Sequence, residues 1–240
     1  MLKKLIMLSL TFASVFSAEK DETVVCIHGF MGGQWSMRYI EKKLTRDGWD
    51  VVNWEYPSRQ AFIRDHASHL VEELQSVVKQ KPGKPVNFVV HSMGSLVLLS
   101  ALNMPNCPEE AKQGEIVLIT PPLQGASYGR WLNQFSLARS VAKDFSGAEL
   151  LTKENFKDLG EYPQTIQRIL VIAGSLGFNP VIRGQNDGTV AVDETQMSRP
   201  HERVVIRRGH KTIVFSPRVY KIISSFFKGE EREPLHRNCM

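Results

Sequence analysis

The chain has 240 residues, of which 42% are hydrophobic and 9% aromatic, enough for one domain with a substantial core, and this composition excludes a disordered chain. Its 30 basic and 25 acidic side chains give a formal net charge of +5, which falls to +3 (28 against 25) without Lys3 and Lys4 at the N-terminal tip. A balance this small argues neither for nor against nucleic acid, and we predict no nucleic-acid partner.

The N-terminus, MLKKLIMLSLTFASVFSAEKDE, has the order of a secretory signal. A basic tip precedes an apolar stretch from Leu5 to about Phe16, and the small residues Ser17 and Ala18 stand before charged residues. We predict a signal peptide over residues 1–18 and an exported protein, periplasmic or secreted. The alternative is an N-terminal helix or strand that stays on a cytoplasmic protein. No other stretch approaches the ~20 apolar residues that span a bilayer, so we expect a soluble mature chain.

The first strand contains one of three cysteines, Cys26, Cys107 and Cys239, an odd number that leaves at least one thiol unpaired within the chain. Cys26 lies in an apolar run, where a thiol packs as a small hydrophobic group. A bridge between Cys107 and Cys239 after export stays open, because spacing alone does not decide a pairing. No Cys-x-x-Cys or Cys/His spacing suggests a metal site.

Short apolar runs recur along the chain with helical patterns between them, which predicts a parallel sheet covered on both faces. The six predicted strands are Val24–Ile27, Val51–Trp54, Phe88–Val90, Ile116–Ile119, Ile169–Ala173 and Val204–Ile206. After the second strand, apolar residues three and four apart from Ile63 to Val78 predict an amphipathic helix. Ser216 and Pro217 are a favourable N-cap and first position for a last helix through Phe227. The predicted fold class is α/β, with an open and mostly parallel sheet.

The segment from Pro121 to Gln167 interrupts this alternation. It contains no strand-like run over ~45 residues, more than a simple crossover needs, so we predict two or three short helices that form a cap insertion over the sheet edge. Trp131 and Phe135 are four residues apart, so on a helix they would share one face and could line an acyl pocket. The same pattern would also pack an ordinary crossover helix onto the sheet. We expect a single domain over residues 19–227 and a polar tail over 228–240.

The sequence VVHSMGS, residues 89–95, places Ser92 on a tight turn between a predicted strand and a helix over residues 96–102. A strained turn of this kind exposes a nucleophilic serine in the pattern Gly-x-Ser-x-Gly. Val90 replaces the first glycine, whereas Gly94 keeps the second, where close packing matters more. The positive end of the following helix points at the same place. A bare strand-to-helix turn is the structural alternative.

A serine becomes a nucleophile only with a base, a group that orients the base, and donors for the oxyanion. The loop IHGFMGG, residues 27–33, follows the first strand, and its glycines allow backbone amides to converge on the serine turn. We predict that the amides of Phe30 and Met93 form the oxyanion hole. His28 precedes the glycine and is predicted to hold the loop by hydrogen bonds.

The acid and the base are expected on loops after later strands. The stretch GQNDGTVAVDE, residues 184–194, contains Asp187 in an Asn-Asp-Gly turn, although turn chemistry alone also explains that sequence. We favour Asp187 over Asp193 because it follows the fifth strand more closely. In IRRGHKTIV, His210 lies on the loop before the final helix, where a base is needed.

With these motifs the chain resembles the α/β-hydrolase superfamily, and above all the small bacterial lipases and esterases with an HSMG elbow. The likeness covers about residues 23–227, with HGFMGG, HSMGS, TPPLQGA, NDGTV and GHKTIV as anchor points. The resemblance implies a catalytic triad of Ser92, Asp187 and His210, in the chain order of that scaffold, and oxyanion amides at Phe30 and Met93. It implies hydrolysis of a small-molecule or lipid acyl ester through an acyl-enzyme, without a cofactor.

Other functions stay open at this point. A thioesterase or an amidase uses the same triad, and the sequence does not separate acyl oxygen from acyl sulfur chemistry. The fold could also serve as a lipid-binding module without catalysis. Peripheral contact with a membrane surface is compatible with a lipid-like ester, and the sequence indicates no oligomeric state.

Overall fold

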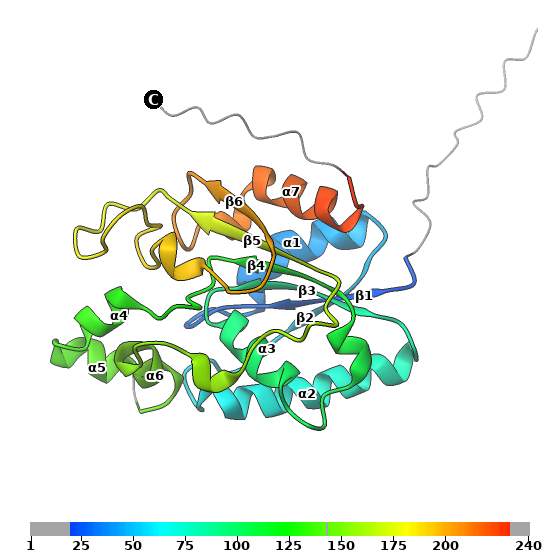
Figure 1. Cartoon of the computed structure of the whole chain (residues 1–240), viewed down its shortest axis with the longest axis horizontal. Helices are drawn as coiled ribbons and strands as arrows, with labels where there is room; N and C mark the ends of the chain where they lie inside the picture. The colour runs from blue at the N-terminus through cyan, green and yellow to red at the C-terminus, as the bar shows by residue number, and fades with distance from the viewer. Residues whose placement is uncertain (1–19, 143, 231–240) are drawn as a thin grey trace, which may run out of the picture.

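The computed structural model describes residues 20–142 and 144–230. Its centre is one sheet of six parallel strands with helices on both faces (Figure 1). The strands are β1 (Thr23–Ile27), β2 (Asp50–Trp54), β3 (Val86–His91), β4 (Glu115–Ile119), β5 (Arg168–Gly174) and β6 (Glu202–Ile206). Each predicted run is a strand, so the α/β fold class is confirmed.

The described helices comprise four that cover the two faces of this sheet and three that lie between β4 and β5 in the chain. They are α1 (Gln34–Arg46), α2 (Ile63–Gln80), α3 (Gly94–Leu102), α4 (Ser127–Leu132), α5 (Ser136–Ala142), α6 (Ser146–Thr152) and α7 (Pro217–Phe227). Helices α1 and α7 cover one face, whereas α2 and α3 cover the other (Figure 1). The last helix begins as predicted, with Ser216 as N-cap and Pro217 at the first position.

The core lies on both faces of the sheet, because alternate residues of each buried strand point to opposite sides. In β1, Val25 and Ile27 pack in the cluster with α2 and α3, and Val24 and Cys26 pack in the cluster with α1 and α7. Burial raises the pKa of the Cys26 thiol far above its usual range, so this thiol stays protonated and packs as a hydrophobic group.

The strand order determines where loops gather. The order is β2-β1-β3-β4-β5-β6, so the chain builds outward in one direction from β1 and then returns to build in the other from β3. In open parallel sheets the crevice at such a reversal, beyond the carboxyl ends of the strands, is the usual ligand site. The loops that leave β1 and β3 meet at this crevice, and they carry the predicted oxyanion loop and serine turn.

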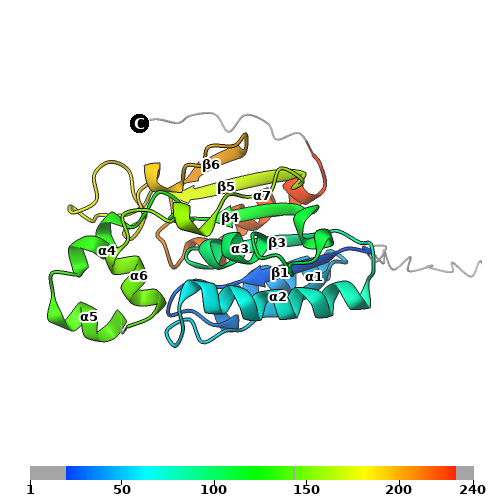
Figure 2. The same ribbon diagram turned by 60° about the horizontal axis from the view of Figure 1, so that its bottom comes forward.

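The segment between β4 and β5 forms the cap. It contains α4, α5, α6 and a short 3₁₀ turn, η2 (Lys157–Leu159), and its described residues include no strand. Figure 2 shows these helices at the end of the sheet toward which the strands point. The cap therefore lies beside the loops that gather at the carboxyl edge.

Two of the sequence-based expectations concern residues outside the ranges that the structure describes. The predicted signal peptide, residues 1–18, and Cys239, the suggested partner of Cys107, lie outside the described residues. Within the described residues, no helix combines the length and hydrophobicity needed to cross a membrane.

Candidate active site

Three side chains from separate loops form a hydrogen-bonded chain at the carboxyl edge of the sheet. The Nε2 atom of His210 lies 2.9 Å from the Oγ atom of Ser92, and its Nδ1 atom lies 2.7 Å from Oδ2 of Asp187. With the Nδ1–H donating to the carboxylate, Nε2 is free to accept the serine proton. Ser92 and Asp187 are buried. The structure therefore brings together the three residues predicted as nucleophile, base and acid.

The serine sits on a strained turn. Its φ angle is +53°, in the left-handed region that costs energy for any residue with a Cβ atom. The N–H and Oγ–H of Ser95 both donate to the Ser92 carbonyl, at 2.9 and 2.7 Å. A Cβ atom at Gly94 would lie 2.6 Å from the carbonyl oxygen of His28 and 3.0 Å from Cγ1 of Val90. Glycine at position 94 is thus what leaves room for valine at position 90.

The acid is held in place by its own turn. Oδ1 of Asp187 accepts the N–H groups of Thr189 and Val190 at 2.9 and 2.7 Å, which leaves Oδ2 for the imidazole. The backbone N–H of His210 also donates to the Asp187 carbonyl at 2.9 Å, so the two loops are joined twice. Asp193, the alternative acid, begins a short 3₁₀ turn and is exposed. The geometry therefore favours Asp187.

The predicted oxyanion loop, residues 27–33, packs directly against the serine. A Cβ atom at Gly29 would lie 2.8 Å from Cβ of Ser92. The Gly29 carbonyl accepts the N–H of Gly32 at 3.0 Å, and because C=O and N–H of a trans peptide point in opposite directions, the Phe30 N–H is turned away from these bonds. Neither the Phe30 N–H nor the Met93 N–H has an acceptor in the described part of the chain. Both amides are available for an oxyanion.

The side chain of His28 holds the loop of residues 27–33 in place. Its Nδ1 atom lies 2.9 Å from the Gly29 carbonyl, and its Nε2 atom accepts the backbone N–H of Tyr56 at 3.4 Å. The phenol of Tyr56 donates to the His28 carbonyl at 2.9 Å, and the two rings stack with centroids 4.3 Å apart. Burial lowers the pKa of His28, which keeps the ring neutral and able to donate and accept at once.

Two residues without a predicted role lie next to the base. Oγ1 of Thr120, the residue after β4, lies 3.3 Å from Nδ1 of His210. His91 Nε2–H donates to the His210 carbonyl, with 3.0 Å between the heavy atoms. Burial, and then repulsion by His210, lowers the pKa of His91 to about 3, so this ring is a neutral donor. Both residues begin motifs that carry the resemblance, Thr120 in TPPLQGA and His91 in HSMGS, but neither motif gave them a predicted role.

The cap is fastened to the loops that form the site. Oε1 of Glu194 accepts the N–H of Ser127 in α4 at 2.6 Å, and its Oε2 accepts the N–H of Ala191 in the acid loop at 2.8 Å. At the other end, Oε2 of Glu149 in α6 accepts the N–H of Ile63, the first residue of α2, at 2.8 Å. Both halves of the cap are therefore tied to the body of the domain.

A second connection joins the cap to the oxyanion loop. The N–H of Met31, one residue after the predicted oxyanion amide, donates to Oγ of Ser58 at 3.1 Å. The Ser58 carbonyl accepts the hydroxyl of Ser146, the first residue of α6, at 2.5 Å. Both serines are buried, and no sequence motif marks either of them.

This connection predicts a role for Ser146 in the reaction rate. Loss of one buried hydrogen bond costs about 1 kcal/mol of folding free energy, and because this bond supports the predicted oxyanion loop, Ser146→Ala is expected to lower kcat for an acetate ester by up to about fivefold at constant KM. Steady-state kinetics beside melting temperatures would test this. The control is Thr152→Ala, which removes a hydroxyl bonded within α6 to the Ala148 carbonyl. Equal kinetics in the two variants would show that Ser146 is merely structural.

The two cap aromatics are not on one helix, which corrects the sequence-based expectation. Helix α4 ends at Leu132, and Phe135 lies in the turn before α5, where its N–H donates to the Leu132 carbonyl at 3.0 Å. The rings of Trp131 and Phe135 nevertheless meet edge to face, with centroids 4.8 Å apart, and Tyr128 stacks on Trp131. A turn, and not the shared face of one helix, creates this contact, so the predicted helix over both residues was wrong.

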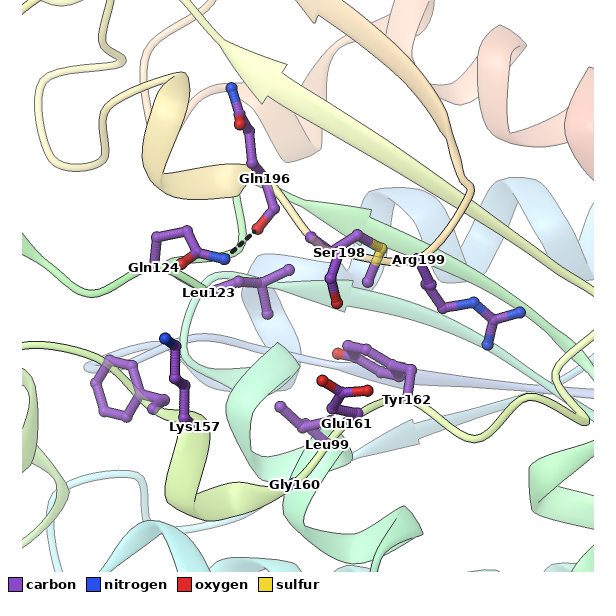
Figure 3. Close-up of a pocket in the computed structure, with 12 residues that line it drawn as sticks. Leu99, Leu123, Gln124, Lys157, Gly160, Glu161, Tyr162, Gln196, Ser198 and Arg199 are labelled. Carbon is purple, nitrogen blue, oxygen red and sulfur yellow. Dashed lines mark hydrogen bonds between the residues drawn. The ribbon is translucent and has the colours of Figure 1, made fainter.

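A pocket of about 680 Å³ lies beside α3 (Figure 3). It is lined by Leu99, Leu123, Gln124, Phe156, Lys157, Gly160, Glu161, Tyr162, Gln196, Met197, Ser198 and Arg199. Neither the triad residues nor Trp131 and Phe135 line it. We therefore locate the chemistry by the hydrogen-bonded triad and not by this pocket. In the described residues, no cluster of three or more His, Cys, Asp or Glu side chains could hold a metal ion.

Comparisons with known proteins agree with this fold. Residues 17–121, which include the oxyanion loop and the serine turn, match the family described as "Putative serine esterase (DUF676)". The mature lipase BlEst2 of Bacillus licheniformis superimposes with a TM-score of 0.69 at 17% identity, over 85% of this chain and 91% of that one. The metagenomic carboxyl esterase MGS0156 superimposes with a TM-score of 0.67 at 16% identity, over 87% of this chain and 76% of that one. The esterase Pf2001 of Pyrococcus furiosus superimposes with a TM-score of 0.62 at 20% identity, over 89% of this chain and 84% of that one. No curated protein matches the sequence.

Proposed function

We propose that the chain, which has the fold of these lipases and esterases, hydrolyses carboxylic esters through Ser92, His210 and Asp187. The observation that carries the proposal is the unbroken hydrogen-bonded chain through the three side chains, next to two amides without acceptors. The match to a serine esterase family supports the same reaction class.

The geometry supports the following sequence of steps. Ser92 Oγ attacks the ester carbonyl carbon while Nε2 of His210 takes its proton, and the resulting oxyanion accepts hydrogen bonds from the Phe30 and Met93 amides. His210 returns the proton to the departing alkoxide, which leaves an acyl-enzyme and a free alcohol. Water then gives a proton to His210 and attacks the acyl carbon, so the acid leaves and Ser92 recovers its proton. Asp187 stays ionised and keeps the imidazole in the required tautomer.

A fluorophosphonate probe tests the reaction class, because it phosphonylates serine only when the base and the oxyanion donors are in place. We expect labelling of the wild type at Ser92, located by mass spectrometry of the labelled peptide, and no labelling of Ser92→Ala. A wild type that stays unlabelled, or a label on another serine, would contradict the proposal and favour a non-catalytic role for the fold.

For the substrate, we propose lipid-like acyl esters held against the cap. The support is the aromatic cluster of Tyr128, Trp131 and Phe135 on the cap, with Phe135 46% exposed and therefore able to contact a ligand. Contact with an acyl chain removes apolar area from water, and each buried methylene contributes about 0.8 kcal/mol.

The variant Trp131→Ala separates this role from simple packing. If the cluster holds the acyl chain, kcat/KM should fall at least tenfold for octanoate esters and less than twofold for acetate esters, because only the long chain reaches the cluster. Chain-length profiles measured beside melting temperatures give the answer. Leu137→Ala, at a 76% exposed residue of α5, serves as control. An equal loss on both esters with a lowered melting temperature would assign Trp131 to packing.

Export stays a proposal that rests on the basic tip and apolar stretch of residues 1–18. Intact mass spectrometry of the protein from its native cell should find a chain that starts near Ala18 or Glu19. A chain that retains Met1 or Leu2 in the cytoplasmic fraction would contradict it.

A further inference from the structure

A cleft of about 290 Å³ at the end of β6 is bordered by three arginines. Leu176 and Ile206 form its apolar part, and Arg207, Arg208 and Arg218 complete its lining. The first two arginines follow β6 directly and precede the His210 loop, whereas the third comes from the first turn of α7. Two segments that are separate in sequence therefore bring three cations to one place.

These charges have no counterion in the described part of the chain. None of the three guanidinium groups forms an ion pair there, and the one hydrogen bond of the Arg208 side chain goes to the Arg207 carbonyl at 3.2 Å. The nearby carboxylate of Asp187 is already bound to His210 and two backbone amides. All three arginines are exposed, so their donors can reach a ligand from solvent.

The start of α7 adds to the positive potential of the cleft. Arg218 is the second residue of this 11-residue helix, whose N-terminus carries partial positive charge. The N-cap residue Ser216 makes no side-chain cap bond. Its hydroxyl is buried, with the residue only 3% exposed, and has no partner among the described residues. Because this hydroxyl is buried and Ser216 does not line the cleft, a bound anion would meet the three arginines and the positive end of the helix rather than the hydroxyl.

We propose that this cleft binds a phosphate group, either as a soluble phosphate or as the head group of a phospholipid. Planar guanidinium groups pair with phosphate oxygens through two parallel hydrogen bonds, and three of them match a tetrahedral ligand with several charged oxygens. A carboxylate offers one charge and two oxygens, too few for three arginines. The site is independent of ester hydrolysis, and the proposal is tested by binding alone.

Titration calorimetry of the full chain with inorganic phosphate tests the cleft. The variant Arg207→Gln/Arg208→Gln/Arg218→Gln should bind phosphate at least tenfold more weakly than the wild type. Arg218→Lys should bind about threefold more weakly, because an ammonium group lacks the two parallel N–H donors of a guanidinium group. The matched control Arg38→Gln/Lys42→Gln/Lys79→Gln removes the same charge from exposed positions of α1 and α2 and should change affinity less than twofold. Equal losses of phosphate affinity in the two triple variants would show that only net charge matters and would contradict the proposal.

Vesicles distinguish the two sources of the phosphate group. If the ligand is a lipid head group, the wild type should sediment with phosphatidylglycerol vesicles, and the triple arginine variant should not. If it is a soluble phosphate, the protein should bind inorganic phosphate but sediment with neither these vesicles nor phosphatidylcholine vesicles. If the protein neither binds phosphate nor sediments with vesicles but still hydrolyses esters, the proposed phosphate site is wrong and the proposed hydrolase function stands. Single glutamine variants at each arginine keep the test valid if the triple variant does not fold.

Discussion

Ser92→Ala is expected to lower kcat for an acetate ester by roughly four to six orders of magnitude, because the nucleophile is removed and the residual rate comes from the oxyanion hole and binding. His210→Ala should cost about as much, and the double variant should be no slower than either single one, since nucleophile and base act as a unit. Alanine keeps the Cβ atom that makes φ +53° unfavourable, so melting temperature should stay close to that of the wild type.

Single-turnover kinetics with purified variants, supported by circular dichroism spectra, would measure this effect. Ser100→Ala, which removes another buried hydroxyl from α3, is the matched control and should keep most of the activity. Losses that multiply in the double variant would show that Ser92 and His210 do not share one step. A small loss of kcat in Ser92→Ala would show that another residue is the nucleophile.

Asp187→Asn has the second largest expected effect, a loss of roughly 10³–10⁴-fold in kcat. The asparagine carbonyl can still accept the N–H groups of Thr189 and Val190, which places the NH₂ group against Nδ1 of His210. Two donors cannot face each other, so the ring adopts the tautomer with its proton on Nε2. That tautomer cannot take the proton of Ser92.

The chain provides its own control for this substitution. Asp193→Asn makes the same chemical change six residues later, at an exposed side chain, and should alter kcat less than twofold. Kinetics of both variants with one acetate ester would decide between the two carboxylates. A larger loss from Asp193→Asn would reverse the assignment of the acid.

The sequence allowed the sheet to be predicted because its strands are buried on both faces and read as continuous apolar runs. The three proposed triad residues could be selected from the sequence because the α/β-hydrolase fold places nucleophile, acid and base on successive loops at one edge, in a constant chain order. The choice of Asp187 over Asp193 depended on distance along the chain, and the same short distance from β5 is what brings it to His210.

The interactions that sequence reasoning missed are contacts between loops. Ser58 joins Met31 to Ser146, and Glu194 joins two backbone amides, and in both cases an ordinary polar residue acquires its role from the surrounding backbone. Nothing in spacing or residue type distinguishes such a serine or glutamate from a solvated one. The contact between Trp131 and Phe135 was expected, but the turn that produces it was not.

The attachment of the cap through Glu194 and Glu149 has a consequence for how this domain can diversify. Glu194 holds the Ser127 amide near the start of the insertion, and Glu149 in α6 holds the Ile63 amide of α2, whereas α5, between Ser127 and Glu149, buries only Ala142 among its described residues. Residues between Leu132 and Val141, whose carbonyl accepts a hydrogen bond from Arg59, can therefore be lengthened, shortened or exchanged without moving the loop that carries Asp187. Libraries of inserts at this position would vary the substrate range while the hydrolytic machinery stays constant.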